Sequence, residues 1–186
     1  MKVSVGVSAR HVHLTKEDFI KLFGYDNLTK LRDISQPGLF AAEETVTIKG
    51  SKGQFNNVRI LGPFREYSQV EVSKTDSYTL GVIPPVRTSG DLDGAEKITV
   101  IGPKGEITKD ICIIADRHIH IRKDEADKQG IKDKQKAFIK IEGEKRGIIE
   151  VSYKVSEHAT FELHLDLDDA NAFLIKQGDI LEIIEK

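Results

Sequence analysis

Four of the six histidines in the chain stand in two copies of one short pattern. Residues 10–14 read RHVHL and residues 117–121 read RHIHI. In a strand, residues two apart point to the same face, so each copy presents two imidazoles side by side. A single H-x-H pair is most often a half-exposed surface pair. Two copies, each after an arginine and just before a predicted helix, favour metal ligands.

Two further residues would complete two sets of three ligands. Catalytic zinc sites take three protein ligands and keep one position open. His164, in the alternating stretch FELHLD, is a third histidine. Glu71, in SQVEVS, is the carboxylate that would fill the remaining place, although the outer face of a half-buried strand explains it equally well. His158, in SEHAT, is expected in a solvated loop.

Arg65 follows a Gly-Pro turn and precedes Glu71 by six residues. A guanidinium group matches phosphate or carboxylate oxygens through its rigid fork of donors. A lone arginine in a loop is usually only solvated, so this residue alone is a weak indication of an anion site.

The composition excludes several classes of protein. The 186 residues carry a net charge of −2 with acids and bases interspersed, which argues against a nucleic-acid partner and favours a small molecule. The apolar stretch in MKVSVGVSA is too short for a secretory signal or a membrane-spanning segment. The single cysteine, Cys112 in the run ICII, is expected to be a buried, unreactive thiol in a reducing compartment.

Alternation of period two predicts a mainly β protein. The predicted strands are KVSVGV, TVTIKG, NNVRIL, SQVEVS, KITVIG, EITKDICII, KAFIKIEG, GIIEVSYKV, TFELHLD and DILEIIEK. Short helices are predicted at TKEDFIKLFG, capped by Thr15 and ended by Gly24, at RKDEADKQG and at DLDDANAFLI. IPPVRTSGDLDG reads as a long surface connection.

The duplication extends beyond the histidine pairs. RHVHLTKED aligns with RHIHIRKDE, and IKGSKGQF resembles VIGPKGEI. Two related halves are indicated, but the pieces follow one another in a different order in each half, so a simple tandem repeat is not established.

The motifs VGVSARHVHL, ISQPGLFAAEETVTIKGSKGQFNNVRILGPFREYSQVEVSKTD, ADRHIHI and FELHLDLDDANA resemble the PduL-type phosphate propanoyltransferase family, the phosphotransacylases of bacterial microcompartments. Ile121, Leu163 and the pair Ser77-Tyr78 depart from its pattern. The resemblance implies two small β-barrels capped by short α-helices, with the active site between them. Residues 1–45 together with 110–186 would form the first barrel, and 46–109 the second.

The resemblance also implies roles for individual residues. It implies two zinc ions, one held by His11, His13 and Glu71 and the other by His118, His120 and His164. It implies that Arg65 is catalytic and binds phosphate. The implied coenzyme A contacts are Ser8, Lys52, Arg59 and Asn171.

The implied reaction is reversible exchange between acyl-CoA plus phosphate and acyl phosphate plus CoA, by direct attack of phosphate on the thioester. The acyl group stays open between propanoyl and acetyl, and the metal between zinc, cobalt and iron. It also stays open whether the chain forms a homo-oligomer and whether an acyl kinase acts downstream. Microcompartment members usually carry an N-terminal targeting extension. Because the first strand begins almost at Met1, we expect a cytoplasmic enzyme.

Three alternatives remain open. A cupin-like metalloenzyme fits the H-x-H pairs followed by Glu17 and Glu125, although both glutamates fall in predicted helices. A metal-dependent thioester or phosphoester hydrolase would use the same ligands with water as nucleophile. A zinc-stabilised binding module would have no catalytic activity.

Overall fold

The computed structural model describes residues 1–184, and the chain divides into two compact units. The first unit consists of Met1–Ser8, Ser35–Pro37 and the chain from Asp116 onward, and the second of Ala9–Ile34 and Gly38–Ala115. The expected boundaries at 45/46 and 109/110 fall inside strands β4 (Phe40–Lys49) and β9 (Glu106–Ala115). The structure therefore divides the chain elsewhere, because a strand continuous in its barrel cannot be split between two units.

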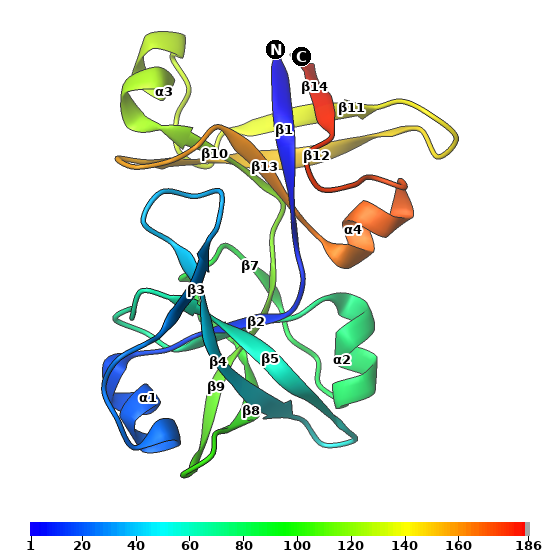
Figure 1. The fold of residues 1–186 in the computed structure, drawn as a ribbon. Helices are drawn as coiled ribbons and strands as arrows, with labels where there is room; N and C mark the ends of the chain where they lie inside the picture. Colours follow the sequence, from blue (N-terminus) through cyan, green and yellow to red (C-terminus); the bar gives the residue numbers. More distant parts are fainter. Residues whose placement is uncertain (185–186) are drawn as a thin grey trace. The chain divides into compact units, whose positions relative to one another are not determined.

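The first unit is a closed six-stranded barrel in the order β1-β13-β10-β12-β11-β14. The ring closes because β1 pairs in parallel with β13 and antiparallel with β14 (Figure 1). Its strands are β1 (Lys2–Ser8), β10 (His118–Arg122), β11 (Lys136–Ile141), β12 (Gly147–Ser156), β13 (Glu162–Asp166) and β14 (Ile180–Ile184), and its helices are α3 (Lys123–Gln129) and α4 (Leu167–Ala172).

The second unit also closes on six strands, in the order β9-β6-β2-β5-β4-β8, because β8 pairs with both β4 and β9. Two further strands, β3 (Lys30–Asp33) and β7 (Val86–Arg87), extend from β4 and β9. The remaining elements are β2 (His11–His13), β5 (Gln54–Gly62), β6 (Gln69–Glu71), β8 (Glu96–Ile101), α1 (Lys16–Phe23) and α2 (Lys74–Leu80). The expected mainly β fold with two small barrels and short helices is confirmed.

The two barrels share one topology and differ by a circular permutation. Position by position around the rings, β1, β13, β10, β12, β11 and β14 correspond to β9, β6, β2, β5, β4 and β8, with the same parallel or antiparallel pairing at every step. The last strand of the second barrel, β9, corresponds to the first strand of the chain, β1. The duplicated histidine patterns therefore occupy equivalent strands, β2 and β10.

The second likeness in the sequence has a different origin, because IKGSKGQF and VIGPKGEI both lie in the second unit. They form the β4–β5 and β8–β9 hairpins. In each turn a lysine backbone N–H donates to the last turn of a helix, Lys52 to Leu80 O and Lys104 to Leu22 O. A Cβ at Gly50 would lie 2.2 Å from Leu80 O, so the backbone can approach the helix this closely only with glycine there.

All ten predicted strands and all three predicted helices are present, and the last two residues of DILEIIEK, 185 and 186, lie outside the described residues. Thr15 caps α1 by accepting from the Asp18 N–H, and Gly24 ends the helix with a φ of 81°. Helix α4 stops at Ala172, earlier than DLDDANAFLI suggested. Helix α2 is absent from the predicted elements, although its capping box, Ser73 with Asp76, is a recognisable start signal.

Each barrel has its own apolar core. Val12, Ile60 and Val70 are fully buried in the second unit, and Val5, Ile119 and Leu163 in the first. Burying one such side chain contributes about 1.5–3 kcal/mol. Cys112 is fully buried, as expected. Among residues 1–184, no helix is long and apolar enough to cross a membrane.

The permuted topology predicts that β14 and β1 can be joined and the chain opened elsewhere, because their counterparts β8 and β9 are joined by a short turn. Met1 N lies 3.3 Å from Ile183 O, so a short turn like that between β8 and β9 can join β14 to β1. We expect a permutant joined there, and opened at the exposed turn between Gly143 and Glu144, to fold with a Tm within about 4 °C of the parent. Circular dichroism and thermal melting test this, and an unfolded permutant would contradict it.

Candidate metal centres and anion site

Three side chains of the second unit converge into a first candidate metal group. His11 and His13 come from β2 and Glu71 from β6, and their potential ligand atoms all lie within 4.8 Å of one another. His11 and Glu71 are direct partners in the antiparallel pairing of the two strands. The Nε2 atoms of His11 and His13 lie 3.4 Å and 4.0 Å from the carboxylate oxygens of Glu71.

The hydrogen bonds of these histidines leave the correct nitrogen for a metal. His11 Nδ1 lies 2.9 Å from Ala9 O, and His13 Nδ1 lies 3.2 Å from Leu61 O. A backbone carbonyl can only accept, so each Nδ1 carries a proton, and in the neutral ring each Nε2 keeps its lone pair. Metal-bound histidines are usually held in this way. The donor set of two imidazoles and one carboxylate fits zinc and similar divalent metals.

Burial and mutual attraction set the charges in this group. Burial by itself would raise the pKa of Glu71, but His11 and His13 outweigh it and hold that pKa well below its usual range. Burial lowers the pKa of His13 well below its usual range, helped by the charges of His11 and Arg65. Burial would also lower the pKa of His11, but attraction to Glu71 prevails and raises it. The group thus keeps an ionised carboxylate beside a neutral imidazole at His13.

The first unit holds a second candidate group, made of His118 and His120 on β10 and His164 on β13. His118 and His164 are direct partners in the antiparallel pairing of these strands. The Nε2 atoms of His118 and His120 lie 3.1 Å apart, close to the ~3.3 Å between two nitrogens on a tetrahedral zinc. His118 Nδ1 lies 2.8 Å from Asp116 O, as in the first group.

The arginine that precedes each histidine pair has a structural role. Arg10 forms an ion pair of 2.7 Å with Asp76 in the first turn of α2, and Arg117 one of 2.8 Å with Asp169 in the first turn of α4. Each of these helices follows the strand that carries the third ligand of its group. The arginines therefore tie the strand of the histidine pair to the strand of the third ligand.

Arg65 lies half-buried beside the first group. Its Nη1 donates to Tyr67 Oη at 3.1 Å and to Ser89 Oγ at 3.3 Å, and its charge depresses the pKa of His13. Among residues 1–184, it forms no ion pair with a carboxylate. A cation in this setting can bind an external anion.

A buried amide connects the surroundings of Arg65 with the first group. Gln69 is fully buried; its Nε2 donates to Glu71 Oε1 at 2.6 Å and to Ser89 Oγ at 2.9 Å, and its Oε1 accepts from the Gly90 N–H. Neither Gln69 nor Ser89 is among the predicted site residues. Gln69 shares a face of SQVEVS with Glu71, opposite the core residues Val70 and Val72, which is a usable signal, whereas Ser89 lies in the loop of IPPVRTSGDLDG and has none.

The expected coenzyme A contacts are distributed over both units. Ser8 ends β1 and Asn171 is exposed on α4, in the first unit. Lys52 is exposed in the β4–β5 turn of the second unit, and Arg59 Nη1 donates to the carbonyls of Ala42 and Glu43.

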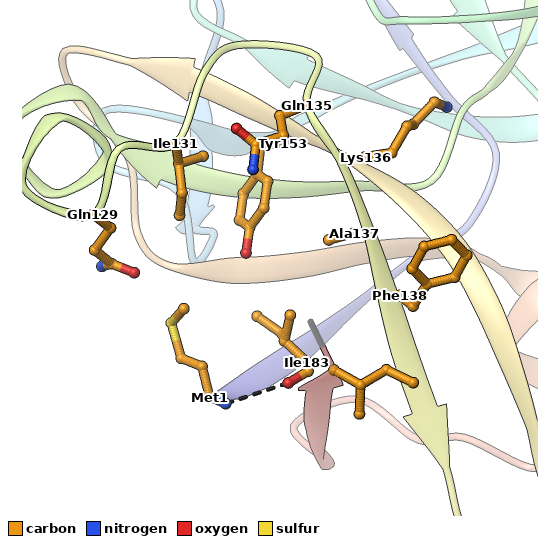
Figure 2. Close-up of a pocket in the computed structure, with 10 residues that line it drawn as sticks. Met1, Gln129, Ile131, Gln135, Lys136, Ala137, Phe138, Tyr153 and Ile183 are labelled. Atoms are coloured by element: carbon orange, nitrogen blue, oxygen red, sulfur yellow. Dashed lines mark hydrogen bonds between the residues drawn. The ribbon is translucent and has the colours of Figure 1, made fainter. Parts of the chain in front are cut away.

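Glu17 and Glu125, the carboxylates of the cupin-like alternative, belong to neither group. Glu17 is exposed on α1, and Glu125 on α3 pairs with Arg122 at 3.3 Å. His158 is exposed, as expected. A pocket of the first unit, between Met1, Phe138 and Tyr153, contains none of the metal-group histidines in its lining (Figure 2).

Comparison with known proteins identifies the family of this chain. Residues 4–176 match the family model described as phosphate propanoyltransferase. The phosphate propanoyltransferase of Priestia megaterium is 51% identical, over 99% of this chain and 87% of its own length. That of Thermotoga maritima is 48% identical, over 98% and 89%, and that of Rhodopseudomonas palustris 44%, over 100% and 83%. The chain belongs to the phosphate propanoyltransferase family, a family of acyltransferases.

Proposed function

We propose that this chain is a metal-dependent phosphate acyltransferase that moves a short acyl group reversibly between coenzyme A and inorganic phosphate. Arg65 carries the proposal, because it is a half-buried cation without a carboxylate partner in the described chain and lies within electrostatic reach of His11 and His13. Membership of the family supplies the reaction class. The name of the family favours propanoyl, although one methylene contributes only about 1–3 kcal/mol of discrimination in an apolar pocket.

In the proposed reaction a phosphate oxygen bonds to the thioester carbonyl carbon, the C–S bond breaks, and the sulfur leaves with the electron pair as CoA thiolate. Arg65 binds the phosphate through its guanidinium fork and so orients an anion that water would otherwise surround. Tyr67 and Ser89 hold the guanidinium in place.

We assign the metal ligands to His11, His13 and Glu71 in one unit and to His118, His120 and His164 in the other, with zinc as the expected metal at both. When bound, such a metal supplies Lewis acidity for a carbonyl oxygen and affinity for a thiolate. The backbone carbonyls of Ala9, Leu61 and Asp116 hold three of the histidines in the tautomer that binds a metal through Nε2.

Direct attack is favoured over an acyl-enzyme. Burial, helped by Glu96 and Asp76, raises the pKa of Cys112 to about 12, so this thiol is not a nucleophile near neutral pH. We assign coenzyme A contacts to Ser8, Lys52, Arg59 and Asn171; Lys52 is exposed and suits a CoA phosphate. Acyl phosphates are phosphoryl donors, so an acyl kinase is the class of enzyme that would consume the product.

The reaction predicts phosphate-dependent thiol release from propanoyl-CoA and acetyl-CoA by protein of assayed metal content. Release should require phosphate and yield acyl phosphate, and Cys112→Ala should behave like the parent because no acyl-enzyme forms. Equal release without phosphate would identify a hydrolase. A folded, metal-loaded protein that releases no thiol in either buffer would favour the binding module.

The metal assignment predicts that His13→Ala loses metal and activity together. We expect about one equivalent less of bound zinc and a drop in kcat/KM of more than ~100-fold, because a ligand is lost from a three-residue set. Elemental analysis and steady-state kinetics on protein checked by circular dichroism measure this. The matched control, His158→Ala, changes an exposed histidine and should keep both values. Full activity of metal-depleted His13→Ala would refute the assignment.

The anion assignment predicts a selective effect of Arg65→Lys. Lysine keeps the charge but lacks the planar fork, so the KM for phosphate should rise about 10-fold while the KM for acyl-CoA changes little. Arg146→Lys, at an exposed position in the β11–β12 turn, is the matched control and should leave both KM values unchanged. Equal changes in both KM values for Arg65→Lys would contradict a dedicated phosphate contact.

A further inference from the structure

In each metal group a buried polar residue stands two positions before the third ligand, on the same face of the same strand. Gln69 precedes Glu71 on β6 and is fully buried, and Glu162 precedes His164 on β13 and is 4% exposed. Gln69 Nε2 lies 2.6 Å from Glu71 Oε1, and His164 Nε2 lies 2.7 Å from Glu162 Oε2. The two pairs occupy equivalent places in the permuted barrels.

In each pair, the neighbour offers the hydrogen-bonding group, donor or acceptor, that the third ligand needs. Glu71 as a carboxylate can only accept, and its neighbour Gln69 offers an amide donor. His164 can donate through one ring nitrogen, and its neighbour Glu162 offers a carboxylate acceptor. Exchanging the two neighbours would place carboxylate beside carboxylate in one barrel and remove the anionic acceptor in the other.

Glu162 is itself held from several sides. Its Oε2 also accepts from Ser35 Oγ at 2.5 Å and from Gln36 Nε2 at 3.2 Å. Gln36 is buried and exchanges hydrogen bonds with the backbone of Thr160, whose Oγ1 donates to Ser35 O. The segment Ser35–Pro37, which belongs to the first unit, thereby fixes the Glu162 side chain.

Gly6 leaves the space that this pair needs. Gly6 is the partner of His164 in the β1–β13 pairing. A Cβ built at Gly6 would lie 2.9 Å from Glu162 Cδ and 3.0 Å from His164 Cδ2. A larger residue there would displace both side chains at once, so the backbone of β1 is shaped around this hydrogen bond.

We propose that Glu162 and Gln69 are positioning residues, each of which fixes the orientation of the third ligand of its metal group. Glu162 accepts the Nε2 proton of His164, so the lone pair of that ring is on Nδ1, unlike the Nε2 lone pairs of His11, His13 and His118. Gln69 donates to Glu71 Oε1 and leaves Oε2 towards His11. The inference rests on the proposed function in taking the two groups as metal sites.

The histidine tautomer can be measured without metal or activity. Long-range ¹H–¹⁵N spectra of metal-free protein at about pH 8 distinguish the two neutral tautomers of each ring, and a His164→Ala variant assigns the signal. We expect His164 to be protonated at Nε2 in the parent and in Glu162→Gln, whose amide oxygen still accepts. Glu162→Leu should give a mixture of tautomers, and an unchanged tautomer in that variant would overturn the role of Glu162.

Metal affinity gives the second readout, by cobalt titration in competition with a chromophoric chelator. Glu162→Leu should lower the affinity for one of the two bound cobalt equivalents by about 10–100-fold. Gln69→Leu should lower the affinity for the other equivalent by a similar factor. Glu162→Gln should lose clearly less than Glu162→Leu. Equal losses in these two variants would mean that the carboxylate itself is a ligand and would overturn positioning, as would unchanged affinities in both leucine variants.

A matched control and a milder variant separate positioning from damage to the fold. Glu150→Gln changes an exposed glutamate on β12 and should leave the tautomer and both affinities unchanged. Ser35→Ala removes one hydrogen-bond donor to Glu162 without changing a buried charge. It should lower the affinity for the same cobalt equivalent as Glu162→Leu, by a smaller factor. A parent protein that binds no cobalt would refute the metal sites, whereas the tautomer experiment would still decide whether Glu162 orients His164.

Discussion

The register between the strand of each histidine pair and the strand of its third ligand is the constraint on which both candidate centres depend. In the second unit β2 and β6 align His11 with Glu71, and in the first unit β10 and β13 align His118 with His164. A slip of one residue would turn every side chain of a strand to the opposite face and disperse the group. Closure of each six-stranded ring opposes such a slip, because every strand is paired on both sides.

Ion pairs and helix starts reinforce this register. The equivalent pairs Arg10–Asp76 and Arg117–Asp169 each join the residue before a histidine pair to the first turn of the helix that follows the third ligand. Partial burial of these pairs makes their geometry more consequential than that of exposed ion pairs. The arginine in RHVHL and RHIHI is thus part of the support for the ligands, which distinguishes it from Arg65, whose charge has no carboxylate partner in the described chain.

The permuted relation between the barrels explains how one chain presents two similar candidate centres with different candidate third ligands. Equivalent strands carry the histidine pairs, and equivalent positions carry Glu71 and His164, each with a buried neighbour two residues earlier. Changing the third ligand from carboxylate to imidazole reverses the required hydrogen-bond polarity. Gln69 and Glu162 follow that reversal, which indicates that ligand and neighbour form one physical unit.

The sequence by itself determined the element types and most candidate ligands. Alternation with period two is local information, so ten strands could be predicted, and the i, i+2 geometry of a strand placed each histidine pair on one face. Motif resemblance implied Glu71 and His164 as third ligands and the joining of β1 to the C-terminal segment. The capping signal of α2 was also present in the sequence but was not used.

Only the tertiary structure decided which strands are neighbours and where the units divide, because pairing across a hundred residues or more leaves no local pattern. It divided the chain after Ser8 and Ala115, where the expected boundaries would have cut β4 and β9. It placed Ser89 against Arg65, and Ser35 and Gln36 against Glu162. These contacts depend on loop paths and long-range register, which single-residue types do not encode.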